Sequence, residues 1–252
     1  MEVKNIICTL FFNRIESPRN KIEELENSKL SKYFMTPFNP QPVPIDAPPA
    51  LPRITASSAD GIYDLIISQI FVQLVRKVPF KYDNDLKAKL EETKNIVLDI
   101  FSNMKTIYNQ DMLYFGTNCI IDINNNLDPV KQIKEKYIKD INDNVCEINL
   151  RYSSVDDEKY YNNIMCSNVK EYQIDIPIQK GQNNIIIDNI STSNMKEINH
   201  IIQFSIDIND KYSFNNIPEY TTSENEINGI FEKVNFTVKS KVSEFLGEWY
   251  LW

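Results

Sequence analysis

The stretch PRITASSADGIYDLIISQIFVQLVRKV, residues 52–78, decides the fold of this 252-residue chain. Within it, β-branched and aromatic residues form three short runs with a largely alternating pattern, which is typical of strands. Asp60-Gly61 is a turn pair, because glycine accepts a positive φ without steric cost, and Ser68-Gln69 marks a second reversal. The stretch therefore predicts an antiparallel meander of three strands.

The sequence on either side of the meander predicts further elements. Residues 2–13 alternate as a strand, and Ser17-Pro18 marks the start of a helix that runs to about residue 34. Residues 36–52 hold seven of the twelve prolines and cannot be helical. We expect this Pro-rich segment to be an extended strap across the surface, or else a docking segment for an aromatic-lined groove. Residues 83–109 have apolar residues at helical spacing and predict a long helix.

The second half of the chain predicts a similar order of elements. Strands are expected at 112–123, 145–152, 169–178, 184–191 and 197–209, and helices are expected to begin at Asp128-Pro129 and at the capping box Ser223-x-x-Glu226. The predicted class is α+β, with antiparallel sheets packed by long helices. Its halves are 1–110 and 111–252, which can also form one continuous domain. The order fits a duplicated β-α-β(3-4)-α unit, as in TATA-binding-protein-like or helix-grip folds.

Composition narrows the classes of function. The net charge is −8 and the basic residues are dispersed, which disfavours nucleic acid as a partner. No stretch approaches the roughly 20 apolar residues that span a bilayer, and the N-terminal apolar run is too short for a signal peptide. We therefore expect a cytoplasmic protein without a membrane partner. Cys8 and Cys146 fall on apolar strand faces, where we expect buried thiols.

Most catalytic signatures are missing from the sequence. Five scattered glycines leave no phosphate-cradling loop, and there is no GxGxxG, P-loop or GxSxG motif. His200 is the only histidine, so any histidine-dependent mechanism must use it. It lies on the apolar face of a predicted strand, which favours a core histidine over a catalytic base. We expect no cofactor, and the sequence leans away from an enzyme.

Two acidic groups are weak candidates for a metal site. The first is Asp122, Asn124 and Asn126, whose alternate oxygen side chains are similar to the start of a calcium loop. Leu127 and Ile133 occupy the positions at which such a loop needs glycine and glutamate, so a structural loop is favoured.

The second group is Asp207 and Asp210, with the acidic cluster 156–158, in which a metal-dependent nuclease or hydrolase could hold its ion. Asp207 projects opposite the apolar face of its strand, and Asp210 follows at the strand's end. Solvated surface is therefore the favoured interpretation of both residues.

Candidate binding residues lie elsewhere. Arg53 begins a strand and Arg151 ends one, so a pseudo-symmetric fold would allow both to line an anion-binding face. The C-terminal residues Trp249, Tyr250 and Trp252 are too apolar to remain in water, and we expect this tail to fold back or to contact a partner.

The chain resembles a sporadically distributed, uncharacterised bacterial protein family of about this length. The resemblance lies in Pro52-Arg53 with Asp60-Gly61, in Leu150-Arg151-Tyr152, in the Ser205–Ile208 strand and in Ile230-Phe231-Glu232. It implies no catalytic residues. The patchy distribution of the family implies an accessory role, such as one in phage–host conflict.

Together these features predict a non-catalytic binding or interaction protein. Its partner would be another protein or a second copy of the chain, which makes a homo-oligomer an expected form. Two alternatives stay open: the metal-dependent hydrolase or nuclease, and a sensor that holds a small ligand between sheet and helix.

Overall fold

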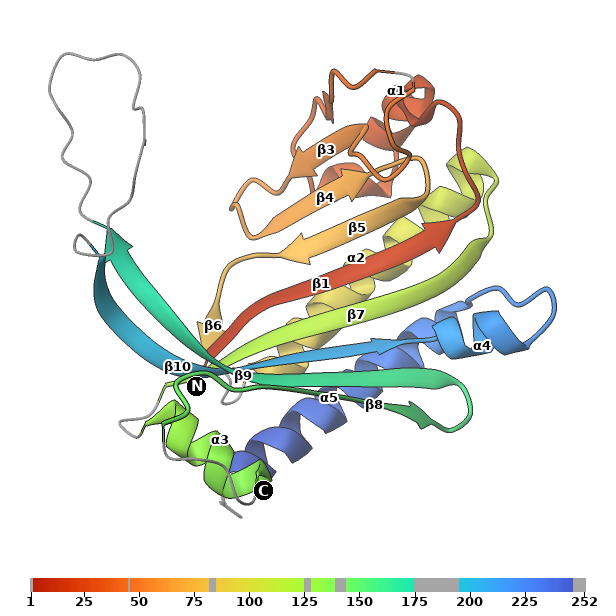
Figure 1. The fold of residues 1–252 in the computed structure, drawn as a ribbon. Coiled ribbons are helices and arrows are strands. Elements are labelled where there is room, and N and C mark those ends of the chain that lie inside the picture. The colour runs from red at the N-terminus through yellow and green to blue at the C-terminus, as the bar shows by residue number, and fades with distance from the viewer. Residues whose placement is uncertain are drawn as a thin grey trace, which may run out of the picture.

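The computed structural model of the chain describes residues 2–44, 46–81, 85–124, 128–138, 144–174 and 195–246, with side chains to residue 241. Its strands form a single antiparallel sheet in the order β2-β3-β4-β5-β1-β7-β10-β9-β8, and β6 pairs with the start of β1 (Figure 1). The strands are β1 (Glu2–Phe12), β2 (Asn39–Pro40), β3 (Ile54–Ser57), β4 (Tyr63–Ile67), β5 (Phe71–Arg76), β6 (Phe80–Lys81), β7 (Met112–Ile123), β8 (Asn149–Asp156), β9 (Tyr160–Ile174) and β10 (Met195–Asn209). The predicted α+β class is confirmed.

The predicted meander is present as β3, β4 and β5. Gly61 has φ +70°, the left-handed conformation that the turn between β3 and β4 requires. Ser68 and Gln69 form the second reversal, where the Ser68 amide donates to the Phe71 carbonyl over 2.9 Å. β5 then pairs with β1, and β1 pairs with β7, so the sheet runs without a break through both halves of the chain.

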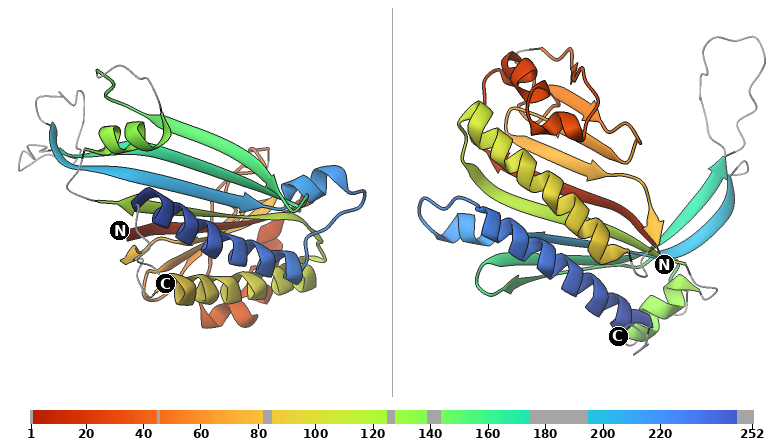
Figure 2. Two further views of the ribbon diagram at one scale, coloured as in Figure 1. Left: turned by 90° about the horizontal axis from the view of Figure 1, so that it is seen from below. Right: turned by 180° about the vertical axis from the view of Figure 1, so that it is seen from behind.

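Two long helices cover one face of the sheet. They are α2 (Leu86–Tyr108) and α5 (Glu224–Leu246), which lie side by side (Figure 2). Alternate strand residues point toward them, and the rings of Phe115 on β7 and Phe231 on α5 stack with centroids 6.0 Å apart. None of the helices in the described part of the chain is long and apolar enough to cross a membrane.

The segment after β1 differs from the single helix expected to about residue 34. It forms two short 3₁₀ turns around one short helix: η1 (Pro18–Lys21), α1 (Ile22–Glu26) and η2 (Lys29–Lys32). Ser17 makes no capping hydrogen bond with its side chain. Ser28 instead accepts from the Leu30 amide and starts a new turn, which ends α1 early.

The Pro-rich segment 36–52 lies against the first edge of the sheet. Its residues Asn39–Pro40 pair with β3 as β2. Phe38 is buried and packs edge-on against Phe34, with ring centroids 6.4 Å apart. The buried Arg53 side chain donates to the carbonyls of Ala47 and Pro48. Phe38 therefore holds the segment near its start, and Arg53 holds it near its end.

The second half contains α3 (Pro129–Tyr137), which contacts β9 and β10, and the short α4 (Lys211–Asn216) after β10. Asp128 caps α3 through the Val130 amide at 2.9 Å, and Ser223 caps α5 by accepting from the Glu226 amide at 3.4 Å. The strand expected at 145–152 begins at Asn149 instead, and Cys146 before it is exposed rather than buried. The strand predicted at 184–191 lies outside the described residues.

Candidate binding face of the sheet

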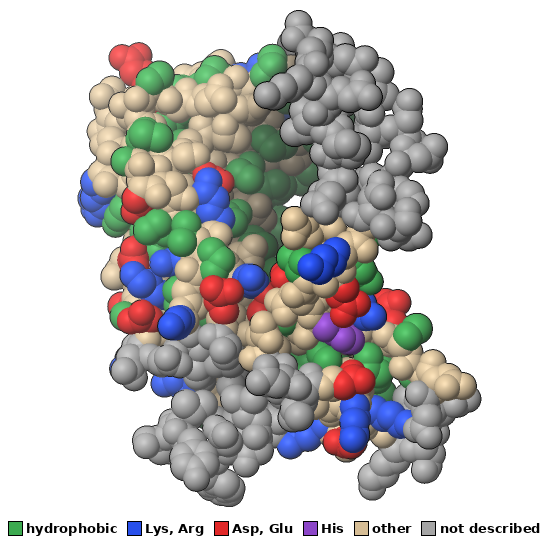
Figure 3. Space-filling view, turned by 90° about the vertical axis from the view of Figure 1, so that its left-hand side faces the viewer, with side chains coloured by type: hydrophobic (Ala, Val, Ile, Leu, Met, Phe, Trp, Pro, Cys, Tyr) green, Lys and Arg blue, Asp and Glu red, His purple; other side chains and the backbone are tan. Residues whose placement is uncertain are grey.

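The face of the sheet opposite α2 and α5, here called the open face, has no described helix over its central strands (Figures 1 and 2). Viewed from the left-hand side of Figure 1, hydrophobic side chains gather in a hollow of the surface (Figure 3). Half-buried residues on five strands point to this face: Phe71, Gln73 and Val75 of β5; Ile7, Thr9 and Phe11 of β1; Tyr114, Asn118 and Ile120 of β7; Ser205, Asp207 and Asn209 of β10; and Tyr161, Asn163 and Met165 of β9. A solvated antiparallel face is normally polar, so the apolar share of this one is unusual.

One side of the open face carries a row of contacting rings, here called the aromatic row: Phe71, Phe11, Tyr114 and Phe214. Phe11 and Tyr114 sit opposite each other on β1 and β7 and stack with centroids 4.2 Å apart. Phe214 reaches Tyr114 from α4 at 5.4 Å, and the Lys211 ammonium lies 5.5 Å from the Tyr114 ring. The row joins three neighbouring strands and α4 into one apolar surface, and such surfaces often mark binding sites.

The other side of the open face is a network of amides and hydroxyls around Asp207. Asn163 donates to the Asp207 carboxylate over 3.0 Å, and Asn209 donates to it over 3.2 Å. On the neighbouring strand pair, the Ser205 hydroxyl donates to the Asn118 side chain over 2.9 Å. Two amide side chains donate to Asp207, so the orientation of this carboxylate on the open face is fixed.

Asp210 lies on the other side of the sheet from Asp207 and is completely buried, so the expectation of a solvated residue is wrong for it. Its carboxylate accepts from the Phe115 amide at 2.6 Å, from the Tyr220 hydroxyl at 2.8 Å and from the Thr222 hydroxyl. Burial raises the pKa of Asp210, and the three donors oppose that rise. The residue ties β7 and β10 to the segment that leads into α5, which is a structural role.

The acidic pair therefore does not come together. Neighbouring positions of a strand point to opposite faces, and Asp210 is three residues beyond Asp207. Asp157 of the 156–158 cluster forms an ion pair with Lys233 of α5 at 2.8 Å. Among the described residues, no group of three or more His, Cys, Asp and Glu side chains could hold a metal ion.

The calcium-like residues have separate partners. Asp122 is buried at the edge of the open face, accepts from Gln203 over 3.0 Å and forms an ion pair with Lys4 at 3.4 Å. Burial raises the pKa of Asp122, against the opposing effects of Gln203 and Lys4. Asn124 donates to Asn199 on β10, and Asn126 lies outside the described residues.

His200 is half-buried on β10, where its Nε2 lies 3.3 Å from the side-chain nitrogen of Asn168. Asn168 also accepts from the Ile148 amide and donates to the Cys146 carbonyl. The histidine is therefore part of the contacts that fix the chain before β8. Among the described residues, no Ser or Cys side chain forms a hydrogen bond with His200.

The proposed anion-binding arginines are far from equivalent. Arg53 is 4% exposed and donates to two carbonyls of the Pro-rich segment and to Gln69. Arg151 is exposed on β8, the last strand of the sheet. The structure does not bring the two residues together, because they belong to opposite edges of the sheet. Trp249, Tyr250 and Trp252 lie outside the described residues.

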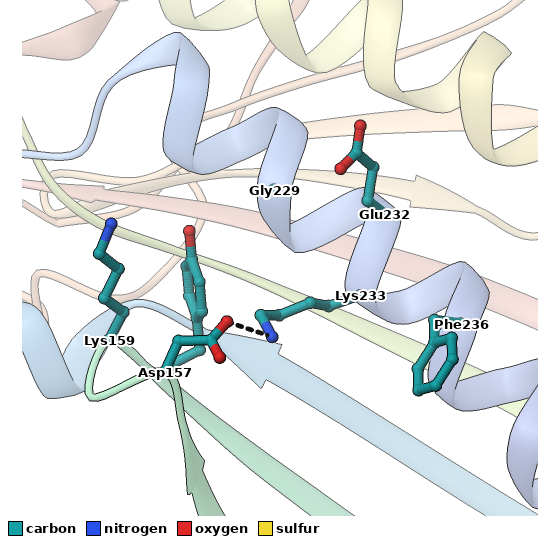
Figure 4. Close-up of a pocket in the computed structure, with 7 residues that line it drawn as sticks. Asp157, Lys159, Gly229, Glu232, Lys233 and Phe236 are labelled. Atoms are coloured by element: carbon teal, nitrogen blue, oxygen red, sulfur yellow. Dashed lines mark ion pairs between the residues drawn. The ribbon is translucent and has the colours of Figure 1, made fainter.

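A surface depression of about 430 Å³ lies between α5 and the turn that joins β8 to β9 (Figure 4). Its floor is Tyr160, whose hydroxyl passes so close to Gly229 that an added Cβ would lie 2.9 Å from it. The Lys233 side chain crosses the depression to reach Asp157 and lies 5.4 Å from the Tyr160 ring. These contacts give the depression a structural role in seating α5.

The sequence contains a signal for the open face. Strand β1 has apolar residues at both alternating sets of positions, because Ile7 and Phe11 interleave with the core residues Ile6, Leu10 and Phe12. Strands that are apolar on both faces are expected where both faces are covered. The structure covers only one of these faces with described helices (Figures 1 and 2).

Comparison of the chain with protein-family models, with curated proteins and with solved structures found no significant match.

Proposed function

We propose that this chain is a non-catalytic binding protein that holds a partner protein on its open face. The observation that carries the proposal is the aromatic row beside the network around Asp207. Protein interfaces are enriched in aromatic residues and need a few oriented polar groups for specificity. Stacked rings supply the first requirement, and the carboxylate with its neighbouring amides and hydroxyls supplies the second.

The charge of the open face favours a protein over a nucleic acid. Asp207 and Asp122 are carboxylates at this face, and the Lys4 ammonium is already paired with Asp122. A polyanion would meet repulsion from these two carboxylates. A polypeptide can instead offer N–H donors to Asp207 and apolar side chains to the aromatic row.

The metal-dependent hydrolase is the weaker proposal. It requires carboxylates that converge on one ion, whereas Asp207 and Asp210 point to opposite sides of the sheet. The small-ligand sensor requires a cavity between sheet and helices. The described depression lies instead on the surface beside α5 and is crossed by an ion pair.

We also propose that the two halves are copies of one β-α-β(3-4)-α unit, as in TATA-binding-protein-like folds. The strand order supports this, since β3-β4-β5-β1 runs inward from one edge and β8-β9-β10-β7 runs inward from the other. If the halves are equivalent units, their order in the chain is interchangeable. A permutant that begins at Met112 and returns to Met1 through a short linker is expected to melt cooperatively with the circular dichroism of the parent. A permutant that stays unfolded would contradict the duplication.

Charged substitutions on the open face test the binding function. Ile7→Lys and Ile120→Lys place ammonium groups in the centre of the face, and we expect the double variant to lose the partner protein that the parent captures from a lysate of its own cells. An ammonium group buried in an apolar interface costs about 1–3 kcal/mol of binding free energy. Each substitution should therefore lower the affinity for the partner at least about fivefold.

The matched control is Met35→Lys, which changes an exposed methionine away from the open face. It should capture the same protein as the parent, and circular dichroism should show that all variants are folded. Capture that survives in the double variant, or that Met35→Lys removes equally, would contradict binding at the open face.

A further inference from the structure

Strand β8 is the last of the described strands at its side of the sheet. It is eight residues long, pairs with β9 without a register shift, and contains no proline. Among the described strands, only β9 pairs with it. Proteins normally protect such an edge with a bulge, a proline, a short strand or a cover. In the described part of the chain β8 has neither a bulge nor a proline nor a second paired strand, and Arg151 is the single charged residue among those that face outward, so its edge can accept another strand.

The hydrogen-bond pattern identifies which backbone groups face outward. The Ile148 carbonyl accepts from the Asn168 amide over 3.2 Å, so residues of even number along this strand bond to β9. The N–H and C=O groups of the alternate residues then point to the free edge. These residues are Asn149, Arg151, Ser153 and Val155, and their side chains are on the open face.

The side chains along the edge are exposed and partly apolar. Tyr152 is 45% exposed and Val155 is 43% exposed, and Phe236 on the neighbouring α5 is 72% exposed. The Lys241 ammonium of α5 lies 5.5 Å from the Tyr152 ring, so a cation adjoins these apolar side chains on the face that α5 covers. Pairing with a second strand would remove these apolar groups from water as well as satisfy the backbone.

We propose that β8 pairs antiparallel with β8 of a second copy of this chain, about a two-fold axis at Ser153. The axis must pass perpendicular to the sheet, which keeps the outward-facing residues of one copy opposite those of the other. Ser153 then lies opposite its own copy, and Arg151 lies opposite Val155. This register sets a small uncharged residue at the axis and keeps the two arginines apart.

The charges of β8 favour this occupant. In the self-paired register the guanidinium of Arg151 lies over an aliphatic side chain, with its own counterpart four residues away on the opposing strand. Like charges that lie directly opposite each other destabilise a pair of strands. In this register no like charges of β8 lie opposite each other. The result is an isologous dimer in which the sheets of two copies become continuous.

Charge substitutions at the axis test this register. Ser153→Lys places two ammonium groups opposite each other, and Ser153→Asp places two carboxylates there, so each variant alone should dimerise at least about fivefold more weakly than the parent. An equal mixture of the two should recover a dimer that contains one copy of each. Light scattering after size exclusion, over a series of concentrations, measures all three samples.

Ser153→Pro provides a second variant that spares the fold. The Ser153 amide points to the free edge, so proline there removes a bond to the second copy and leaves the β8–β9 ladder intact. We expect a monomer with the circular dichroism of the parent, whereas the control Ser154→Thr should remain dimeric. A parent that is monomeric at every concentration, or a mixture of charged variants that associates no more tightly than each alone, would overturn the proposal. Neither outcome would bear on binding at the aromatic row, which lies on β5, β1, β7 and α4, away from the edge of β8.

Discussion

Replacement of Asp210 by alanine is expected to lower the free energy of unfolding by about 3–5 kcal/mol, because it removes the acceptor of a buried network. The Phe115 amide and the hydroxyls of Tyr220 and Thr222 would all lose their partner inside the protein. These groups belong to β7 and to the segment before α5, so the loss affects the joint between sheet and helix. Urea unfolding followed by circular dichroism measures the change.

The pH dependence of stability gives a second readout of Asp210. Burial raises the pKa of Asp210 in the folded protein, so the native state holds this proton more tightly than the unfolded chain does. Its contribution to stability is therefore largest below the ordinary aspartate pKa of about 3.9 and falls as the pH rises through the raised value. In Asp210→Asn this dependence is absent, so the difference in stability between parent and variant should shrink as the pH rises.

Asp207→Ala is the matched control for the same strand. Asp207 is half-exposed on the open face, and its two amide donors can turn to water, so we expect a loss of at most about 1 kcal/mol. A variant Asp210→Ala that is within about 1 kcal/mol of the parent would contradict the structural role assigned to Asp210.

Replacement of Arg53 by alanine is expected to cost about 3 kcal/mol, since hydrogen bonds from a charged donor contribute about 1.5–3 kcal/mol each. Its guanidinium is 4% exposed and donates to the carbonyls of Ala47 and Pro48 and to the side chain of Gln69. The Pro-rich segment would lose an attachment near its C-terminal end. Limited proteolysis should then cut within residues 36–52 much faster than in the parent, and urea unfolding should show the lost stability.

Two further variants show whether the shape of the Arg53 side chain or only its charge matters. Arg53→Lys keeps the charge but lacks the planar fork, so we expect it to recover less than half of the lost stability. Arg14→Ala removes an exposed arginine whose ion pair with Glu16 is 3.6 Å long, and its effect should stay within about 0.5 kcal/mol. Equal effects of Arg53→Ala and Arg14→Ala would contradict the attachment.

Local patterns in the sequence predict the larger elements of this fold well. The long helix expected at 83–109 is α2, because its apolar residues recur at helical spacing over six turns. The strand expected at 112–123 has those bounds in the structure, and its alternation is regular over the middle of the strand. The turn at Gly61 and the helix starts at Asp128 and Ser223 lie where the turn and capping residues predict them.

The sequence is less informative where long-range contacts decide the structure. Pairing of β1 with β7 joins residues a hundred or more positions apart, and no local pattern identifies that partner. α1 ends early because the Ser28 side chain competes for a backbone amide and starts a new turn. The helical spacing of the apolar residues does not reveal this competition. β8 begins four residues later than predicted, because the Ile148 amide donates to the side chain of Asn168 and not to a backbone carbonyl of β9.

The candidate site is harder to predict for a related reason. The alternation of β10 correctly places Asp207 on the face opposite the core. It does not show that Asp210 is buried among three hydrogen-bond donors. Arg53 looks like an anion ligand in the sequence, whereas its acceptors are backbone carbonyls of the Pro-rich segment. The open face cannot be predicted without the order of the strands in the sheet, because its rings come from β5, β1, β7 and α4.

The claim at the centre of this account is that the open face contacts a partner protein, and site-specific crosslinking in the cell tests it most directly. A photoreactive amino acid at position 120 lies on the open face, and one at Lys239 lies on the exposed side of α5. We predict that position 120 crosslinks to one protein of defined mass and that position 239 does not. No crosslink from position 120, or the same products from both positions, would contradict the account.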